Sequence, residues 1–242
     1  MSEPLLSVRG LEARYGAAQI LFGLDLELNA GEVVALMGRN GAGKSTTMKS
    51  IMGLVDRRQG RITFRGRDIS HARPHEIARA GLGYAPEDRR IFSDLTVMEN
   101  LEVGRQPPRI GLDGAPMTPW TPDRLFALFP NLAEAGDRAA GRMSGGEQQM
   151  LTVARTLMGN PYAILLDEPS EGVAPIIVEQ MADMILSLKK TGVAILLSEQ
   201  NLPFAALVSD RVYVLEKGEI RYSGAMRALE QDEEARRLYL EV

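Results

Sequence analysis

A strand, a glycine loop and a helix in direct succession constrain this chain more than any other stretch. The apolar run Val33–Met37 is typical of a buried strand, Gly38–Ser45 fits the pattern G-x-x-x-x-G-K-[ST], and a helix is expected from about Ser45 to Met52. In such a loop the backbone N–H groups wrap phosphates, Lys44 reaches the β- and γ-phosphates, and the Ser45 hydroxyl contacts Mg²⁺. A chance match on a glycine-rich turn is the alternative, which the flanking strand and helix disfavour.

The remaining segments predict an α/β fold with strands buried on both faces and an antiparallel edge. Apolar and polar residues alternate around Leu24–Leu28, which indicates antiparallel strands with turns at Gly16 and at Ala30-Gly31. Further strands are expected at Arg61–Phe64, Ala163–Leu166 and Val193–Leu197, a helix at Ile176–Lys189, and a hairpin of Arg211–Leu215 and Glu219–Tyr222 about Lys217-Gly218.

A mostly helical insert is expected between the two parts of the sheet, from about residue 88 to 158. Inside it, the stretch 107–122 holds five prolines and two glycines, so it is interpreted as a loop that contains Trp120. The tail Glu230–Leu240 is interpreted as a solvated helix in which Glu233 lies near Arg236 and Arg237.

Composition disfavours several classes of function. The net charge of −4 gives no electrostatic case for binding nucleic acid, and the absence of cysteine excludes disulfides and thiol chemistry. The start MSEPLLSVRG shows no signal-peptide pattern, and no apolar run is long enough to span a bilayer. His71 and His75 have helical spacing, but Pro74 lies between them and no third ligand is near, so no metal site is expected there.

Two neighbouring carboxylates follow a second buried strand. Asp167 and Glu168 come directly after Ala163–Leu166, where both side chains can reach the carboxyl edge of the sheet. We expect Asp167 to hold Mg²⁺ through water, and Glu168 to orient and polarise the attacking water. Because an ordinary glutamate is a weak base at neutral pH, its contribution would be mostly placement. An acidic turn at a strand end is the alternative for this pair taken alone.

A second glycine pair opens a later helix. Ser144, a natural N-cap, precedes Gly145-Gly146, and backbone N–H groups at such a helix start attract phosphate. The following helix, Glu147–Met158, carries an apolar stripe at Met150, Val153, Ala154, Leu157 and Met158. The chain's own phosphate loop does not explain this second anion-facing surface, so the sequence favours a nucleotide shared with another copy. A capped helix after a flexible turn is the alternative.

Taken in order, Gly38–Ser45, Met143–Gln149 and Ile164–Glu168 resemble the motifs of the ATP-binding subunits of ABC transporters, over nearly the whole chain. The resemblance implies a P-loop NTPase (RecA-like) α/β core with an antiparallel β subdomain and a helical subdomain insert. Residues 1–242 would form a single nucleotide-binding domain, with 1–87 and 159–242 as core and β subdomain and about 88–158 as the helical subdomain. It also implies ATP and Mg²⁺ as cofactors, and a head-to-tail dimer in which the signature at Ser144 caps the γ-phosphate held by the other subunit.

The resemblance also carries individual roles onto matching positions. Nucleotide contacts fall on Tyr15, Gly38, Arg39, Asn40, Gly41, Ala42, Gly43, Lys44, Ser45 and Thr46, and, across the dimer, on Ser144, Gly145 and Gly146. Tyr15, placed ahead of the first strand pair, would stack on adenine. Metal contacts fall on Ser45, Glu87 and Asp167, and the catalytic roles on Glu168 and Gln200.

Three positions depart from the family pattern. Glu87 stands where a glutamine usually contacts Mg²⁺ and senses the membrane partner, and its carboxylate can still ligate Mg²⁺ while adding charge near the γ-phosphate. Gln200 replaces the usual histidine, and it can donate a hydrogen bond to the γ-phosphate without carrying a charge. Ala174 replaces an expected aspartate, so one contact across the dimer loses its carboxylate.

Together, Pro86-Glu87, Pro169–Pro175 and Glu199–Asn201 resemble the ATPases of branched-chain amino-acid importers, and importers of urea or short amides share these features. This implies a peripheral subunit at the cytoplasmic face of the cell membrane. Its partners would be transmembrane permease subunits, a second ATP-binding subunit, identical or different, and indirectly a solute-binding protein. Ile91 and Phe92 lie where the family places the groove for the membrane partner. The alternatives are a soluble ABC ATPase acting on DNA or ribosomes, and a regulatory module that holds ATP without turnover.

Overall fold

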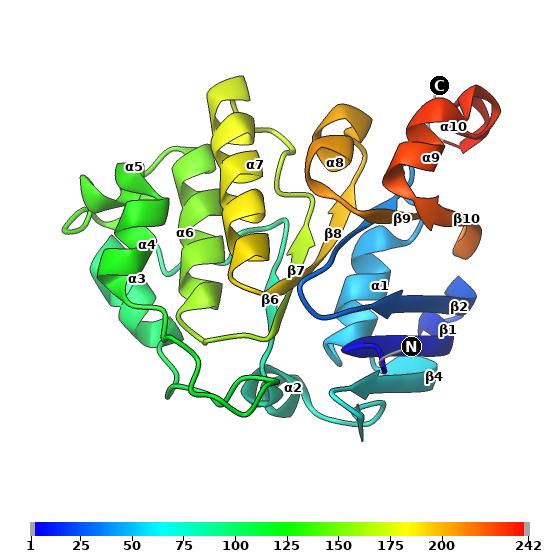
Figure 1. Cartoon of the computed structure of the whole chain (residues 1–242), viewed down its shortest axis with the longest axis horizontal. Helices are drawn as coiled ribbons and strands as arrows, with labels where there is room; N and C mark the ends of the chain where they lie inside the picture. The colour runs from blue at the N-terminus through cyan, green and yellow to red at the C-terminus, as the bar shows by residue number, and fades with distance from the viewer. Residues whose placement is uncertain (1–2, 240–242) are drawn as a thin grey trace.

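The computed structural model describes residues 3–239, which form two β-sheets and a set of covering helices (Figure 1). One sheet is antiparallel, with strand order β2-β1-β4-β5, and the other has the order β10-β9-β3-β8-β7-β6. In the second sheet β9, β3, β8, β7 and β6 run parallel, and β10 pairs antiparallel with β9 at one edge. The predicted α/β class with an antiparallel edge is therefore confirmed.

The strands have the following bounds: β1 Leu6–Tyr15, β2 Ala18–Leu28, β3 Val33–Met37, β4 Arg57–Phe64, β5 Arg67–Asp68, β6 Leu82–Ala85, β7 Ala163–Asp167, β8 Ala194–Glu199, β9 Arg211–Glu216 and β10 Glu219–Ala225. The central strands β3, β7 and β8 are buried at every residue. Such continuous apolar strands are typical of parallel sheets covered on both faces.

The helices have the following bounds: α1 Lys44–Ile51, α2 Pro74–Ala80, α3 Val97–Gly104, α4 Pro122–Leu128, α5 Pro130–Ala133, the 3-10 turn Ala140–Arg142, α6 Gly145–Leu157, α7 Pro175–Lys190, α8 Leu202–Val208, α9 Met226–Gln231 and α10 Glu233–Tyr239. Between residues 88 and 158 the regular elements are helical apart from two isolated bridges. We propose that this segment is a helical subdomain inserted between residues 1–87 and 159–242.

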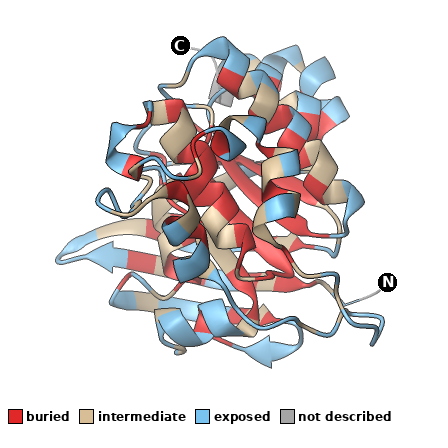
Figure 2. Ribbon diagram, turned by 90° about the vertical axis from the view of Figure 1, so that its left-hand side faces the viewer, coloured by how far each residue is buried: buried red, intermediate tan, exposed pale blue. Residues whose placement is uncertain are grey.

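Three apolar clusters hold the layers together (Figure 2). The first joins one face of the parallel sheet to α6 and α7, and it buries the predicted stripe of α6. The second lies between the two sheets around α1, which contacts β1 and β2 on one side and β7 and β8 on the other. Helix α1 therefore starts in the middle of the molecule, where the carboxyl ends of the central strands converge.

Two expectations about local structure need correction. The tail is not one helix over Glu230–Leu240, because the chain breaks at Asp232, whose carboxylate accepts a hydrogen bond from the Ala235 backbone N at 2.9 Å and starts a new helix. Ala235 is buried, so this helix is anchored by one face. Tyr15 ends the first strand and does not precede it. Leu240, the last residue of the expected tail helix, lies outside the described residues. So do the first two residues of MSEPLLSVRG, the segment in which no signal-peptide pattern was found.

The proline-rich stretch 107–122 is a loop, as predicted, and it is tied down at its end. Trp120 is buried, its backbone N donates to Asn160 Oδ1 at 2.7 Å, and the Arg124 guanidinium lies over its ring. In the described part of the chain, no helix combines the length and apolar character that crossing a bilayer requires.

Candidate nucleotide site

The phosphate loop follows from the backbone geometry of its glycines. Strand β3 ends at Met37, and a Cβ on Gly38 would lie 2.3 Å from the Leu215 carbonyl oxygen, so only glycine allows this close approach to β9. Gly43 has a left-handed φ of 113° immediately before α1, where any side chain would be strained. The loop therefore wraps directly onto the N-terminus of a helix, an arrangement that favours phosphate.

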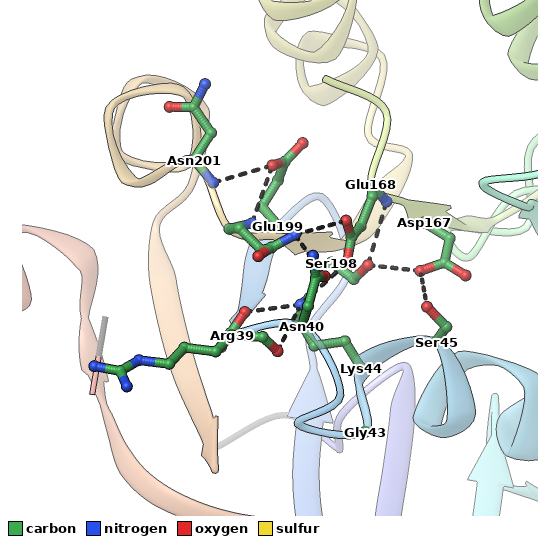
Figure 3. Close-up of polar contacts among 12 residues, drawn as sticks. Arg39, Asn40, Gly43, Lys44, Ser45, Asp167, Glu168, Ser198, Glu199 and Asn201 are labelled. Atoms are coloured by element: carbon green, nitrogen blue, oxygen red, sulfur yellow. Dashed lines mark hydrogen bonds and ion pairs between the residues drawn. The ribbon is translucent and has the colours of Figure 1, made fainter. Parts of the chain in front are cut away.

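Lys44 is almost fully buried in this loop, with 3% of its surface exposed. Its Nζ donates to the carbonyl oxygens of Gly38 at 2.7 Å and Arg39 at 3.2 Å, and it forms an ion pair with Glu168 Oε1 at 3.0 Å (Figure 3). The ammonium is thus held beside the loop and already compensated by a carboxylate. A bound triphosphate would compete with Glu168 for this cation.

Asp167, at the carboxyl end of β7, is hydrogen-bonded to three hydroxyl groups. Its carboxylate accepts hydrogen bonds from Ser45 Oγ at 3.1 Å, Ser198 Oγ at 2.7 Å and the Tyr84 hydroxyl at 2.9 Å. Burial, followed by the negative charge of Asp167, raises the pKa of Tyr84, so this phenol remains a donor. The loop, β6, β7 and β8 therefore meet at one carboxylate.

The oxygen atoms at this point fit a magnesium ion. The Ser45 hydroxyl and the Asp167 carboxylate are within hydrogen-bond distance of each other, and Glu87 lines the same cavity of about 480 Å³ as Lys44 and Ser45. Mg²⁺ in proteins is usually held by one or two carboxylates together with substrate phosphates and water. Residues 3–239 contain no group of three or more histidine, cysteine, aspartate or glutamate side chains placed to hold a metal ion by themselves.

Glu168 has an unusual backbone conformation for its type, a left-handed φ of 47°. Such a conformation costs about 1–3 kcal/mol in a non-glycine residue and occurs mainly at functional sites. The backbone N of Glu168 donates to the Ser198 carbonyl oxygen at 3.1 Å, which holds the turn. The side chain then points toward the phosphate loop, where it meets Lys44 and the Gln200 amide Nε2, 3.1 Å from Glu168 Oε2.

Gln200 joins two parts of the site. Its Nε2 also donates to Asn40 Oδ1 at 2.7 Å, so one amide links the phosphate loop to Glu168. The buried Glu199 beside it accepts hydrogen bonds from the backbone N of Ser170, Gln200 and Asn201. Burial raises the pKa of Glu199 despite these bonds. This carboxylate fixes the loops after β7 and β8 to each other.

The pKa values of Glu168 and Glu171 are shifted in opposite directions. Burial alone would raise the pKa of Glu168, but hydrogen bonds from Glu171, Lys44 and Gln200 outweigh it and hold that pKa below its ordinary value. The hydrogen bond to Glu168, with burial and repulsion from Glu168 and Glu87, raises the pKa of Glu171 to about 7. Glu171 is thus the protonated member of the pair when Glu168 is ionised.

The second glycine pair, Gly145-Gly146, forms the capped N-terminus of α6. Ser144 Oγ accepts from the Glu147 backbone N at 3.3 Å, and Glu147 Oε2 accepts from the Ser144 backbone N at 2.7 Å, which forms a capping box. A Cβ on Gly146 would lie 2.8 Å from Ile177, so glycine is needed for packing against α7. Ser144 is exposed, and Ser144–Gly146 do not line the cavity that contains Lys44.

The structure brings some predicted residues together and leaves others apart. Lys44, Ser45, Thr46, Glu87 and Glu168 line one cavity with Asn40, Gly41 and Gly43. Tyr15 is 48% exposed at the β1–β2 turn and does not line it, although Ile20 of β2 does. Sequence reasoning assigned no site role to Tyr84, Ser198, Glu199 or Glu171. Glu171 and Glu199 lie in segments that the family resemblance singled out, whereas the signal for Tyr84 and Ser198 was their position near the ends of parallel strands.

A separate hollow of about 560 Å³ lies between α2, β6 and α3. Phe92, which is 48% exposed, and Arg155 line it, and the Arg155 guanidinium lies 5.0 Å from the Phe92 ring centroid. Ile91, by contrast, is partly buried against the first apolar cluster. Of the two residues singled out from the sequence, Phe92 is the one available to a partner.

A strand–glycine loop–helix cradle, a lysine at its centre and two carboxylates at the end of a neighbouring strand define a P-loop nucleoside triphosphatase. Residues 21–171 match the ABC transporter family. The branched-chain amino acid transport ATP-binding protein BraG of Pseudomonas aeruginosa is 39% identical over 98% of this chain and 99% of its own length. The lipopolysaccharide export ATP-binding protein LptB of Haemophilus influenzae is 35% identical over 98% of this chain and 97% of its own length.

Among solved structures, the ADP conformation of the ABC transporter cassette MJ1267 superposes with a TM-score of 0.78 at 28% identity, covering 97% of each chain. The chain belongs to the ABC transporter family, as an ATP-binding subunit with an ATPase activity coupled to transport. The resemblance stated from the motifs is thereby confirmed, and so is the P-loop NTPase fold.

Proposed function

We propose that this chain hydrolyses ATP to drive an importer of branched-chain amino acids. The observation that carries the proposal is its similarity to BraG over nearly the full length of both chains. Pro86-Glu87, Pro169–Pro175 and Glu199–Asn201, the three segments that resemble this branch, surround the cavity or cross-link its loops. Importers of urea or short amides, and the exporter class to which LptB belongs, are the competing assignments.

Two copies, or this chain and a similar one, would bind ATP between them. The support is that Ser144, which is exposed, caps a helix start formed with Gly145 and Gly146, and that these three residues lie outside the cavity of their own chain. In a head-to-tail pair these N–H groups would face the γ-phosphate held by Lys44 of the other copy. Tyr15 would stack on adenine, since its ring is exposed at the β1–β2 turn.

The phosphate loop would bind the triphosphate through its backbone N–H groups, from Gly38 to Thr46. Ser45, Asp167 and Glu87 would hold Mg²⁺, which supplies positive charge to the β- and γ-phosphates. Glu168 would orient a water molecule and accept its proton, after the triphosphate has drawn Lys44 away from the carboxylate. Gln200 would position Glu168 and donate to the γ-phosphate, since its Nε2 already lies between Glu168 and Asn40.

The membrane partners would dock in the hollow at Phe92, next to the segment that leads from Glu87. The hollow is lined by apolar residues together with polar and basic ones such as Arg79 and Arg155, a combination that suits a partner helix with an apolar face and a polar edge. In this proposal the chain would lie at the cytoplasmic face of the membrane, bound to permease subunits that receive solute from a binding protein. The proposal includes no nucleic-acid partner.

Uptake measurements test the solute assignment. Cells that lack this chain should lose uptake of labelled leucine, isoleucine and valine, and wild-type chain should restore it, whereas Lys44→Ala should not. If amino-acid uptake is retained and urea or amide uptake is lost, the chain would instead be assigned to the importers of urea or short amides. Retained uptake of every solute, with lipopolysaccharide missing from the cell surface, would support the exporter class of LptB and refute the import proposal.

A further inference from the structure

A second cavity, rich in positive charge, lies apart from the nucleotide site. It measures about 360 Å³ and is lined by the side chains of Arg65, Arg67, Arg79 and Arg109, together with apolar residues. Arg65 and Arg67 flank the β4–β5 turn, Arg79 lies in the last turn of α2, and Arg109 lies in the loop after α3. No carboxylate from the described ranges of the chain lines this cavity.

The four guanidinium groups lack acidic partners. Between residues 3 and 239, none of Arg65, Arg67, Arg79 and Arg109 forms an ion pair, and Asp68 beside them pairs with Arg61. Burial, and then the positive charge of Arg65, lower the pKa of Arg109. In a chain with a net charge of −4, these four groups form a local concentration of positive charge that would attract an anion.

The wall of the cavity is held rigidly by Arg109 and Tyr162. Arg109 Nη1 donates to the Arg79 carbonyl oxygen at 2.7 Å, and its Nε to that of Gly159 at 3.3 Å. The Tyr162 hydroxyl donates to the Ile110 carbonyl oxygen at 2.6 Å, and the Arg65 guanidinium lies 3.7 Å from the Tyr162 ring centroid. One wall of the cavity is therefore held in place by these contacts, which lowers the cost of ordering it around a ligand.

The position of this cavity separates it from the phosphate loop. Tyr162 directly precedes β7, and Arg79 ends α2 just before β6, whereas Glu87 and Glu168 follow the carboxyl ends of the same strands. The two cationic sites therefore lie at opposite edges of the parallel sheet. Helix α2 and strand β4 lie at the same lower end of the molecule in Figure 1. Arg79 also lines the hollow at Phe92.

We propose that the cavity formed by Arg65, Arg67, Arg79 and Arg109 binds a phosphate group. The planar guanidinium group matches phosphate oxygens, and four such groups around one cavity supply the positive charge for this anion. Beside the cavity, Ile110 and Leu112 are each 55% exposed. Apolar side chains next to a basic cluster are typical of a surface that rests on anionic lipid, so a phospholipid headgroup is the favoured source of the phosphate.

The test uses the full chain saturated with ADP, so that the phosphate loop is filled. Co-sedimentation measures binding to vesicles of phosphatidylcholine alone and of phosphatidylcholine mixed with phosphatidylglycerol, and calorimetry measures binding of pyrophosphate in solution. The variant is Arg65→Gln with Arg67→Gln. The matched control is Arg227→Gln with Arg237→Gln, which removes the same charge from two exposed positions on α9 and α10. Thermal unfolding confirms that both variants are folded.

We expect anionic vesicles to bind the wild type and the control, and the variant to bind about tenfold more weakly, since each basic residue near an anionic surface contributes to the attraction. Pyrophosphate binding lost in the same variant, without vesicle binding, would support the phosphate site and assign it to a soluble ligand. Equal weakening in variant and control, or no binding of either probe by the wild type, would overturn the proposal.

Discussion

Lys44 Nζ lies 3.0 Å from Glu168 Oε1, and both side chains are almost fully buried. The cation expected to bind phosphate and the carboxylate expected to act on water thus neutralise each other within one chain. A buried pair of this kind is costly to break unless a new partner replaces the lost one. The phosphates of ATP would be the new partner of Lys44. Glu168 would then keep its hydrogen bond from Gln200 and could bind the attacking water molecule.

The first prediction concerns Glu168→Gln, which preserves shape and removes the charge. We expect turnover to fall by at least about 100-fold, because the negative charge that orients and polarises the attacking water is lost. ATP should remain bound and hold two copies together, seen as a doubled mass in size-exclusion chromatography with ATP and Mg²⁺. Glu230→Gln, on the exposed end of α9, is the control. Unchanged turnover in Glu168→Gln would refute the catalytic assignment.

Ser144→Arg tests whether the signature at Ser144 acts on ATP that is bound by the phosphate loop of the other copy. The bulky cation should block the capped helix start and lower turnover by about 100-fold or more, the loss typical when a donor to a developing charge is removed. ATP affinity measured for the monomer should stay near that of wild type, because Ser144 does not line its own chain's cavity. Ser223→Arg, an exposed position on β10, is the control. A parallel loss of affinity and turnover would place the signature within the chain's own pocket.

Gln200→Ala removes the amide that links Asn40 to Glu168. We expect kcat to fall about fivefold to tenfold, since each such hydrogen bond contributes about 1 kcal/mol. The dissociation constant for ATP should change little, because the phosphate loop is intact. Gln231→Ala, exposed at the end of α9, serves as the control. A large loss of ATP affinity with unchanged kcat would contradict a positioning role for Gln200.

Glu171→Gln tests the raised pKa of Glu171 through the pH dependence of the free energy of unfolding. The pKa of Glu171 is raised from 4.5 to about 7, so between these values the folded chain keeps a proton that the unfolded chain releases. Its contribution to the free energy of unfolding is therefore fully present below 4.5 and is lost as the pH rises through about 7. Because Glu171 is exposed, solvent screening keeps this contribution small.

In urea titrations at about pH 5 and about pH 8, wild type should lose stability relative to Glu171→Gln at the higher pH. The variant mimics the protonated carboxyl and should be less sensitive to pH over this range. A difference between the two chains that is constant with pH, or that changes in the opposite sense, would show that Glu171 does not hold the proton.

The sequence predicted those parts of the site that lie within single short segments. Val33–Ser45 could be placed because strand, loop and helix are contiguous, and Ser144 could be identified as an N-cap from its neighbours alone. Tyr84, Ser198 and Glu199 could not be found, because their roles arise only when β6, β7 and β8 are aligned in register. Register between distant strands is set by tertiary packing, which local patterns do not encode.

The error in the tail has a local origin, whereas the arginine cluster depends on tertiary structure. The single tail helix was expected from charge spacing, but the Asp232 carboxylate competes for the backbone and caps a separate helix. The arginines that line the second cavity come from three separate segments, and no spacing rule connects Arg65 with Arg109.

The central claim is that each chain carries an incomplete active site, which a second chain completes around a shared ATP. The most direct measurement is ATP turnover per chain over a dilution series, with the molecular mass determined at each concentration. We predict that turnover per chain falls on dilution in proportion to the fraction of dimer. Full turnover in a preparation that is monomeric at every dilution would contradict the claim.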